Sequence, residues 1–372
     1  MRRLRLGVIG VGHLGKAHAR IAAGLDCIEL VGVVDPVESN RAQVAAQYQV
    51  EACAHHRELL GRIDAVVIAT PTRFHQDVAL DLAAHGVHLF IEKPITSTLA
   101  EADELLATAQ RHGVLVQVGH VERFNPVLTG VLPHVREPKF IDACRASTFK
   151  FRSTDIGVVF DLMIHDIDLV LSLARSPVID VEALGISVFG QFEDVANARL
   201  TFENGCVATL TASRASYQAV RQMQIWSERT FASLDFATRN ARLVHPHASL
   251  LRREFDTRQL SMAEVDHLKD HLFEDLLRIE DVQGEACDQL TAEQLDFVDS
   301  IQNARSPRVS GAQGRDAVAV AERVLEKIAE HQWDGHRAGR IGALAQPAPA
   351  IIPGPHWHLP AARELRERKE AG

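Results

Sequence analysis

A short stretch of the chain gathers side chains that could exchange protons with a substrate. These polar residues recur at helical spacing, so a regular helix would align them in one stripe. They are Asp161, His165, Asp168 and Ser172. The rest of 160–172 is almost wholly apolar, and burying such groups is costly unless they pair or face a ligand. The pattern indicates acid–base chemistry. The structural alternatives are a core His–Asp pair and a helix cap at Asp161.

A second group of residues could bind a phosphate-containing ligand. The apolar run ending at Ile9 leads into Gly10, Gly12 and Gly15, a G-x-G-x-x-G motif where a helix could begin. These glycines allow a tight turn, close approach of the backbone to a pyrophosphate, and close packing of helix on strand. Asp35 ends the next apolar run about 20 residues later, where an acid can accept from ribose hydroxyls. The motif predicts a nicotinamide or flavin dinucleotide site; the structural alternative is a simple turn.

Asp35 also indicates which nicotinamide cofactor is preferred. Its carboxylate would accept from both hydroxyls of the adenosine ribose and would repel a 2′-phosphate. Pro36 and Val37 follow directly, so neither Arg nor Ser stands there to receive a phosphate, although Arg41 is near in sequence. We therefore predict NAD as the cofactor. No metal site is expected.

These residues need a scaffold that brings them together, and residues 1–120 alternate strands with helices. This rhythm predicts a doubly wound parallel sheet, a Rossmann domain. Strands are expected at 6–9, 30–34, 65–69, 87–91 and 115–118, and helices at 39–47, 74–85 and 99–112. Ligands of such sheets bind beyond the carboxyl ends of the strands. Thr70, Pro71, Glu92 and Lys93 stand at such ends.

The pattern changes after Gly119 to segments that favour a largely antiparallel sheet. Strands are expected at 140–149, 181–189, 195–202, 207–213, 221–227 and 231–236, and helices at 291–303 and 311–332. The stretch 252–289 has helical spacing, and its end could instead be a strand. We predict an α/β protein with a Rossmann domain at 1–120 and a substrate-binding and oligomerisation domain at 121–334. A Pro-rich arm follows at 335–372, with Trp357 as a candidate anchor on a neighbour.

Composition narrows the class of protein. A chain of 372 residues with 46% hydrophobic content can fill the cores of two ordinary domains. Its net charge of -9 argues against a nucleic-acid or acidic-membrane surface. The five cysteines are widely spaced and never form C-x-x-C, which favours a reducing compartment. No signal sequence is visible, and no apolar stretch approaches the ~20 residues of a membrane helix. We expect a cytoplasmic protein.

Several motifs, in this order along the chain, resemble the Gfo/Idh/MocA oxidoreductases. The glycine fingerprint is followed by A-T-P-T with His75 behind it, then by the triplet that begins at Glu92, then by Asp161-x-x-x-His165. The closing segments D-F-V-D-S-I and S-P-R-V-S-G also look like that family. The resemblance covers roughly residues 4–330. It implies a Rossmann domain followed by an α/β domain whose open sheet commonly mediates oligomerisation.

The resemblance also implies roles for individual residues. Glu92 and Pro71 would help hold the cofactor, Lys93 would lie by the nicotinamide, and Asp161 and His165 would contact a sugar. The full set expected at the cofactor is Gly10, Gly12, His13, Leu14, Gly15, Asp35, Thr70, Pro71, His75, Glu92 and Lys93. Many members carry glycines around the Asp. This chain has Val158, Val159 and Met163 there, so the pocket shape cannot be transferred.

Hydride transfer from a carbinol carbon needs an acceptor for the hydroxyl proton. Neutral His165 is the first candidate for this base. Lys93 could stabilise the alkoxide by its charge, or act as the base itself if desolvation lowers its pKa. Asp161 could orient His165. Neither Tyr48 nor Tyr217 is followed four residues later by lysine, which argues against the Tyr-x-x-x-Lys chemistry of short-chain dehydrogenases.

The segment 118–126 and the stretch from Asp161 to Asp168 look like the branch that oxidises the 3-hydroxyl of UDP-N-acetylglucosamine. That reaction leads to 3-amino sugars of lipid A in some bacteria, so an aminotransferase is the expected metabolic partner. Arg123 and Asn125 would suit a pyrophosphate or sugar contact; alternatively, Arg123 ties the two domains together. The substrate-binding set is thus Lys93, Arg123, Asn125, Asp161 and His165.

Other functions stay open at this point. One is a dehydrogenase of a free sugar or inositol, and another is a non-catalytic NAD-sensing regulator of the same fold. An NAD-dependent glycosidase of the same family is not excluded either. Retention of Lys93, Asp161 and His165 together argues against the regulator. A homo-oligomer, dimer or tetramer, is expected.

Overall fold

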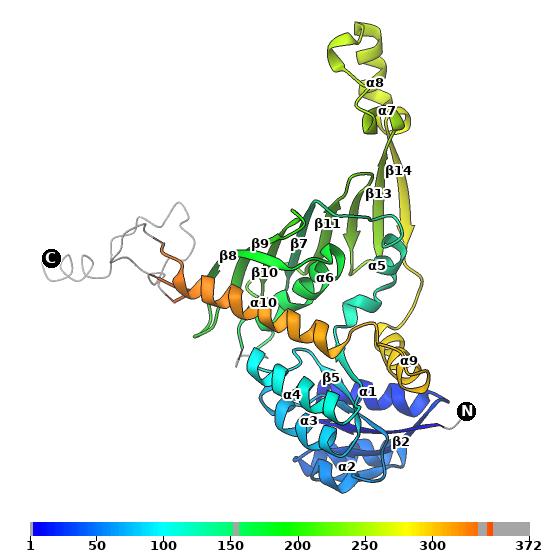
Figure 1. Ribbon diagram of the computed structural model, residues 1–372, viewed down its shortest axis with the longest axis vertical. Helices are drawn as coiled ribbons and strands as arrows, with labels where there is room; N and C mark the ends of the chain where they lie inside the picture. The colour runs from blue at the N-terminus through cyan, green and yellow to red at the C-terminus, as the bar shows by residue number, and fades with distance from the viewer. Residues whose placement is uncertain (1–2, 152–155, 334–340, 345–372) are drawn as a thin grey trace, which may run out of the picture.

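A computed structural model describes residues 3–151, 156–333 and 341–344 (Figure 1). The expected Pro-rich arm with Trp357 lies outside these residues, apart from 341–344. The described chain forms two layered units: a parallel sheet between helices and a larger, mostly antiparallel sheet with helices on one face. The predicted fold class is therefore confirmed. Within the described ranges, no helix is both long enough and apolar enough to cross a membrane.

The first sheet has six parallel strands in the order β3-β2-β1-β4-β5-β6. They are β1 (Leu4–Ile9), β2 (Ile28–Val34), β3 (Glu51–Cys53), β4 (Ala65–Ile68), β5 (His88–Glu92) and β6 (Val116–Gly119). The connecting helices are α1 (His13–Gly24), α2 (Glu38–Tyr48), α3 (His75–Ala84) and α4 (Leu99–Arg111). The strand order reverses between β1 and β4, and ligands of doubly wound sheets bind at such a switch point. Residue 10 therefore lies where a dinucleotide is expected.

The second sheet has eight strands in the order β14-β13-β12-β11-β7-β10-β9-β8, antiparallel except for the β7–β10 pair. They are β7 (Phe140–Ala146), β8 (Val178–Ile186), β9 (Val195–Phe202), β10 (Val207–Ser213), β11 (Val220–Trp226), β12 (Phe231–Asp235), β13 (Asn240–Pro246) and β14 (Leu277–Gln283). Strand β13 was not predicted, because its run N-A-R-L-V-H-P carries only three strongly apolar side chains. The strand considered for the end of 252–289 exists as β14.

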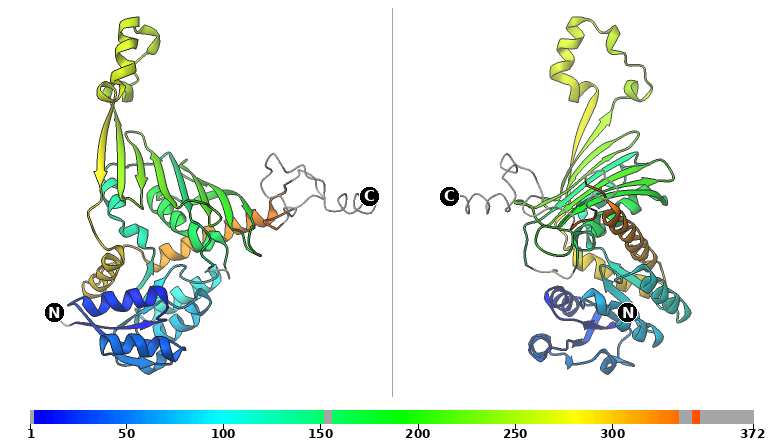
Figure 2. Two further views of the ribbon diagram at one scale, coloured as in Figure 1. Left: turned by 180° about the vertical axis from the view of Figure 1, so that it is seen from behind. Right: turned by 90° about the vertical axis from the view of Figure 1, so that its left-hand side faces the viewer.

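Helices cover one face of this second sheet, as Figures 1 and 2 show. They are α5 (Pro126–Val131), α6 (Ile164–Ala174) and α10 (Gly311–Glu330). Buried residues of α6 and α10 share one apolar core with alternate residues of the strands, the period-2 pattern of a half-covered sheet. Helices α7 (Ala248–Leu251) and α8 (Met262–Asp275) instead project from the tip of β13 and β14 (Figure 2) and bury none of their residues.

The chain returns to the first layer after β14. Helix α9 (Gln289–Gln302) packs Phe297 and Val298 into the core of the parallel sheet, where Phe297 contacts Phe90 with ring centroids 5.7 Å apart. Fully burying a side chain of that size contributes about 1.5–3 kcal/mol. A predicted boundary at residue 120 therefore does not separate the cores completely, since α9 adds to the first one. The exact domain boundaries given above stay a prediction.

Candidate active site

A cleft with a volume of about 500 Å³ opens where the two units meet. Its walls come from the start of α1, the ends of β4 and β5, the segment around Asp161, strand β11 and helix α9. Three of the residues predicted to carry chemistry line it together: Lys93, Asp161 and His165. They come from different elements, so the fold, and not local sequence, assembles the site.

The glycine-rich turn fits a pyrophosphate at the start of α1. A Cβ on Gly10, whose φ is +82°, would lie 2.8 Å from the carbonyl oxygen of Ala69, and one on Gly15 would lie 1.7 Å from the Gly10 oxygen. A Cβ on Gly12 would meet no described atom within 4 Å. Gly12 is the N-cap of helix α1, so the helix has no side-chain cap, and its first turn contains no acidic residue. Its first N–H groups are thus available to an anion, and the empty space beside Gly12 admits one.

Asp35 lies buried at the end of β2, next to this turn. Its Oδ2 accepts from the Val11 N–H at 3.0 Å and its Oδ1 accepts from the Val37 N–H at 2.9 Å. These bonds fix the carboxylate beside the glycines. Oδ1 also lies 3.5 Å from the Asn40 amide nitrogen, whereas Oδ2 has one donor and keeps a lone pair for a ribose hydroxyl. Arg41 donates to the backbone oxygens of Asp35 and Pro36, at 3.3 and 3.2 Å, so its guanidinium is held near that position.

Of the other residues expected at the cofactor, His13 and Leu14 line the cleft. His75 is buried away from it, with Nε2 2.9 Å from the Thr70 oxygen and Nδ1 2.9 Å from the Pro94 oxygen. Burial lowers the pKa of this imidazole. A neutral imidazole has one N–H, so His75 donates to one of these carbonyl oxygens while its other ring nitrogen lies against the second, between the loops that follow β4 and β5. Neither Thr70 nor Pro71 lines the cleft itself, whereas the neighbouring Ala69 and Thr72 do.

Glu92 is held by a chain of hydrogen bonds that the sequence did not indicate. Gln294 of α9 donates Nε2–H to His18 Nδ1 at 2.9 Å, which leaves Nε2 of His18 as the protonated ring nitrogen. That nitrogen donates to Glu92 Oε1 at 2.7 Å. Burial opposes ionisation of Glu92, but this bond and the charge of Lys93 leave its pKa below the ordinary value. Glu92 is thus an oriented carboxylate beside Lys93.

Lys93 and Asp161 contact each other in the cleft. The ammonium of Lys93 donates to the backbone oxygen of Asp161 at 2.6 Å and lies 3.8 Å from Asp161 Oδ1. Val159–Met163 form a π-helical turn before α6, and the wider turn changes the angle between Asp161 and the residues that follow. The expected single stripe on a regular helix is therefore broken. Asp161 faces Lys93, and no bond joins it to His165 among the described contacts.

His165 lines the same cleft as a neutral imidazole. Burial, followed by the charges of Lys93 and Arg145, holds its pKa well below the ordinary value. Its Nδ1 is buried and has no hydrogen-bond partner in the described ranges. His120 lies against it edge to face, with ring centroids 6.3 Å apart. A neutral, incompletely partnered imidazole beside a lysine can accept a proton from a bound hydroxyl group.

Arg123 and Asn125 are placed differently from the expectation that they bind substrate. Arg123 lies 3.5 Å from Asp168 and lines a separate pocket, which Ser172 also lines. Asn125 is buried; its Nδ2 donates to Glu122 at 3.0 Å and its Oδ1 caps α5 at the Val127 N–H. In this conformation neither side chain lines the cleft. Both side chains instead contact other protein groups, which favours the alternative of a structural role.

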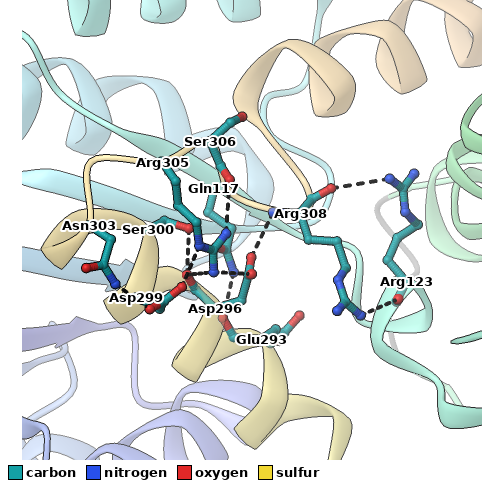
Figure 3. A network of polar contacts seen from close by, with 10 residues as sticks. All are labelled: Gln117, Arg123, Glu293, Asp296, Asp299, Ser300, Asn303, Arg305, Ser306 and Arg308. Atoms are coloured by element: carbon teal, nitrogen blue, oxygen red, sulfur yellow. Dashed lines mark hydrogen bonds and ion pairs between the residues drawn. The ribbon is translucent and has the colours of Figure 1, made fainter.

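Arg123 belongs to a polar network that joins the units, shown in Figure 3. It donates to the backbone oxygen of Arg308 at 3.2 Å, and Arg308 donates back to the oxygen of Arg123 at 3.3 Å. Asp296 of α9 accepts from Arg305 and from the Arg308 N–H. At the other side of the network, Gln117 donates to the backbone oxygen of Glu293 at 2.8 Å (Figure 3). These bonds fix α9 against β6 and the segment that precedes α10.

A buried ion cluster adjoins the cleft, which two of its members, Arg145 and Glu122, line. Arg145 on β7 pairs with Asp166 at 2.8 Å and with Glu122 at 2.8 Å. Burial opposes the charge of the guanidinium, but the two carboxylates outweigh it and raise its pKa. Burial raises the pKa of Asp166, and Arg145 counteracts this. Asp166 lies within the stretch 160–172, but no sequence pattern indicated its partner on β7, the strand of the second sheet on which α6 packs.

A switch-point turn for a dinucleotide, facing a lysine and a neutral imidazole across a cleft, defines a nicotinamide-dependent dehydrogenase. Comparison with known proteins agrees. Residues 4–120 match the oxidoreductase family with an NAD-binding Rossmann fold, and residues 134–231 match the GFO/IDH/MocA C-terminal domain. The chain belongs to the Gfo/Idh/MocA family of oxidoreductases. The predicted family, enzyme class and NAD cofactor are confirmed.

Individual relatives differ in how much of the chain they cover. UDP-N-acetylglucosamine 3-dehydrogenase of Acidithiobacillus ferrooxidans is 35% identical over 87% of this chain and 97% of its own. A solved structure of that enzyme aligns with a TM-score of 0.77, covering 88% and 98% of the two chains. The scyllo-inositol 2-dehydrogenase of Bacillus subtilis is 29% identical over 58% of this chain and 68% of its own.

Proposed function

We propose that this enzyme oxidises the 3-hydroxyl of UDP-N-acetylglucosamine to the 3-keto sugar, with NAD as oxidant. The observation that carries the proposal is the near-complete overlap with a relative of that activity, at 35% identity over 97% of the relative. The cleft supports it, because Lys93, Asp161 and His165 lie together there as a sugar dehydrogenase requires. The inositol dehydrogenase covers much less of the chain, so a free polyol is the second candidate.

The residues of the cleft divide the chemical work as follows. Bound NAD would supply the acceptor for the hydride that leaves the carbinol carbon. His165, kept neutral by burial and by Lys93, accepts the hydroxyl proton at a ring nitrogen. The Lys93 ammonium stabilises the developing negative charge on the oxygen. Asp161 holds Lys93 in place and accepts hydrogen bonds from neighbouring sugar hydroxyls. Lys93 as the base is the alternative.

A nucleotide sugar also needs a contact for its diphosphate. Arg221 on β11 is exposed, lines the cleft and forms no ion pair with a carboxylate in the described part of the chain. Arg145, by contrast, is already paired twice. We therefore assign the diphosphate contact to Arg221 in place of Arg123. Binding energy from the nucleotide can then position the sugar ring, so removal of UDP should lower kcat/KM steeply.

The proposed product is an unstable 3-keto sugar, so an aminotransferase that captures it is the expected metabolic partner. We therefore also propose a role in 3-amino sugar synthesis for lipid A and a location in the cytoplasm, where nucleotide sugars and NAD are found. The uncovered face of the second sheet is the proposed surface for a homo-oligomer, either a dimer or a tetramer.

The test follows NADH formation from UDP-N-acetylglucosamine, free N-acetylglucosamine and myo-inositol side by side. An added aminotransferase with glutamate traps the keto sugar. We expect turnover of the UDP-sugar only, and we expect Arg221→Ala to raise its KM more than it lowers kcat. Turnover of a free sugar or polyol, with none of the trapped UDP-sugar, would contradict the substrate and leave the family-level activity. No turnover of any of them, with NAD still bound, would favour the regulator.

A further inference from the structure

Glu293 on α9 is a buried carboxyl group that the chemistry above does not use. Its side chain is 0% exposed, yet it lines the same cleft as Lys93 and His165. Neither carboxyl oxygen has a hydrogen-bond partner within residues 3–151, 156–333 and 341–344. A buried polar group without partners costs free energy comparable to a lost hydrogen bond, so its retention needs a reason.

The neighbours of Glu293 determine its protonation. Ligand atoms of Glu293, Glu92 and His18 all lie within 4.8 Å of one another. The His18 ring donates its one N–H to Glu92, so it has none to offer Glu293. Burial, followed by the charges of Glu92 and of Asp288 at the start of α9, raises the pKa of Glu293 well above its ordinary value. Glu293 is therefore an uncharged acid with one O–H donor and one carbonyl acceptor.

The position of Glu293 is fixed by the fold. Gln117 of β6 binds its backbone oxygen, and Phe297 one turn later is buried in the core of the parallel sheet. The carboxyl thus points into the cleft from a rigid helix. Within the cleft it lies near Glu92, the residue before Lys93, whereas Gly12 and Asp35, the residues predicted for the adenosine half, are absent from the lining.

We propose that Glu293 contacts the nicotinamide end of bound NAD as an uncharged carboxylic acid. The nicotinamide carboxamide and its ribose hydroxyls each offer both a donor and an acceptor, which match the O–H and C=O of a neutral acid. A carboxylate would offer acceptors only and would repel Glu92. The assignment depends on the cofactor and not on the identity of the sugar, so it is independent of the proposed substrate.

Calorimetric titration with NADH and with ADP, which lacks the nicotinamide end, tests this contact without any substrate. Glu293→Leu should weaken NADH binding on the order of 10-fold, the loss of a buried hydrogen-bonding group, and leave ADP binding unchanged. Glu293→Gln should stay within a few-fold for both ligands, because an amide also donates and accepts. Glu326→Gln, on the exposed face of α10, is the matched control and should change nothing.

Equal NADH affinity in wild type and Glu293→Leu would overturn the contact, and so would an equal loss of NADH and ADP. The pH dependence of NADH binding by the wild type is a second measurement, which remains possible if Glu293→Leu fails to fold. Wild-type affinity for NADH relative to ADP should fall as pH rises through the raised pKa of Glu293, since the ionised form loses its donor. The charged and titratable groups facing Glu293 are Glu92, His18 and Asp288. The wild type and Glu293→Gln both contain all three. The same fall in Glu293→Gln would refute the neutral acid.

Discussion

Two clusters of buried charged or titratable groups adjoin the cleft. They differ in how many of their polar atoms have hydrogen-bond partners. In the saturated cluster, Arg145 binds Asp166 through two nitrogens and Glu122 through a third. In the open cluster, Glu293, His165 and His120 keep buried polar atoms without partners among the residues described. His165 and Asp166 are adjacent in sequence but belong to different clusters. The saturated groups fix helix α6 and the turn after β6 to strand β7, whereas the open groups have capacity for a ligand.

The largest expected effect is a loss of kcat in variants of the cleft residues Lys93 and His165. Lys93→Met or His165→Asn should lower kcat by ~10²–10⁴-fold, because each removes a group that stabilises charge or moves a proton. NADH affinity and thermal stability should stay close to wild type. Stopped-flow turnover and calorimetry separate the two quantities. Ser172→Ala, on the same helix as His165 but in the other pocket, serves as the control. Near wild-type kcat in either variant would mean that the open cluster is structural.

The pH profile sharpens the assignment of the base. His165 acts unprotonated, and its pKa is lowered by burial and by Lys93, so the acid limb of kcat should lie well below pH 6.5. In Lys93→Met the second of these causes is gone, so the limb should move to higher pH. Disappearance of the limb in Lys93→Met would indicate that Lys93, not His165, is the titrating group, and an unmoved limb would contradict the effect of the Lys93 charge on His165.

A mutation in the saturated cluster should instead lower the free energy of unfolding. Arg145→Met leaves two carboxylates buried without their cation, and breaking such a pair typically costs about 3–5 kcal/mol of unfolding free energy. Urea denaturation measures it. Arg242→Met, which removes an exposed ion pair with Asp281 on the second sheet, should barely shift the curve. Unchanged stability of Arg145→Met, with turnover lost, would move Arg145 from the saturated cluster into the catalytic site.

Asp35 combines both behaviours, since its oxygens accept from backbone N–H groups and it is also the residue predicted to bind the adenosine ribose. Wild type should prefer NAD over NADP by on the order of 100-fold in kcat/KM, because like charges in contact cost several kcal/mol. Asp35→Ser should reduce this ratio, and Arg41 would then be close enough to receive a 2′-phosphate. Comparable or better kcat/KM of the wild type with NADP would contradict the role of the carboxylate.

The smallest effect is expected at Asn125. Because its amide caps α5 and binds Glu122, Asn125→Ala should cost about 1 kcal/mol of stability and leave the KM for the sugar substrate unchanged. Thermal unfolding and initial rates measure the two. A several-fold rise in KM with unaltered stability would restore the substrate contact predicted from sequence.

The fold and the cofactor turn could be predicted because their signals are local. Gly10 and Gly15 are needed for the close approaches they make, Gly12 leaves open space between them, and strand and helix periods repeat regularly along residues 1–120. The helix of Asp161 was expected to be regular, since the sequence carries no mark of a π-helical turn. Glu293 was not predicted at all. His18 and Gln294 are 276 residues apart, and only the return of α9 to the first layer brings them to Glu92.

Because the chain returns to the first layer so late, folding of the parallel sheet during synthesis is affected. Strand β6 is the edge of the parallel sheet, and Val118 donates to the oxygen of Val309 while Gln117 bridges to Ser310. During synthesis from the N-terminus, the ribosome must therefore complete about nine-tenths of the described chain before this edge is covered. Until then the nascent Rossmann unit exposes an apolar strand edge, the kind of surface on which chaperones act and intermediates aggregate. Truncations before residue 310 should accumulate as insoluble chains, not as a free NAD-binding domain.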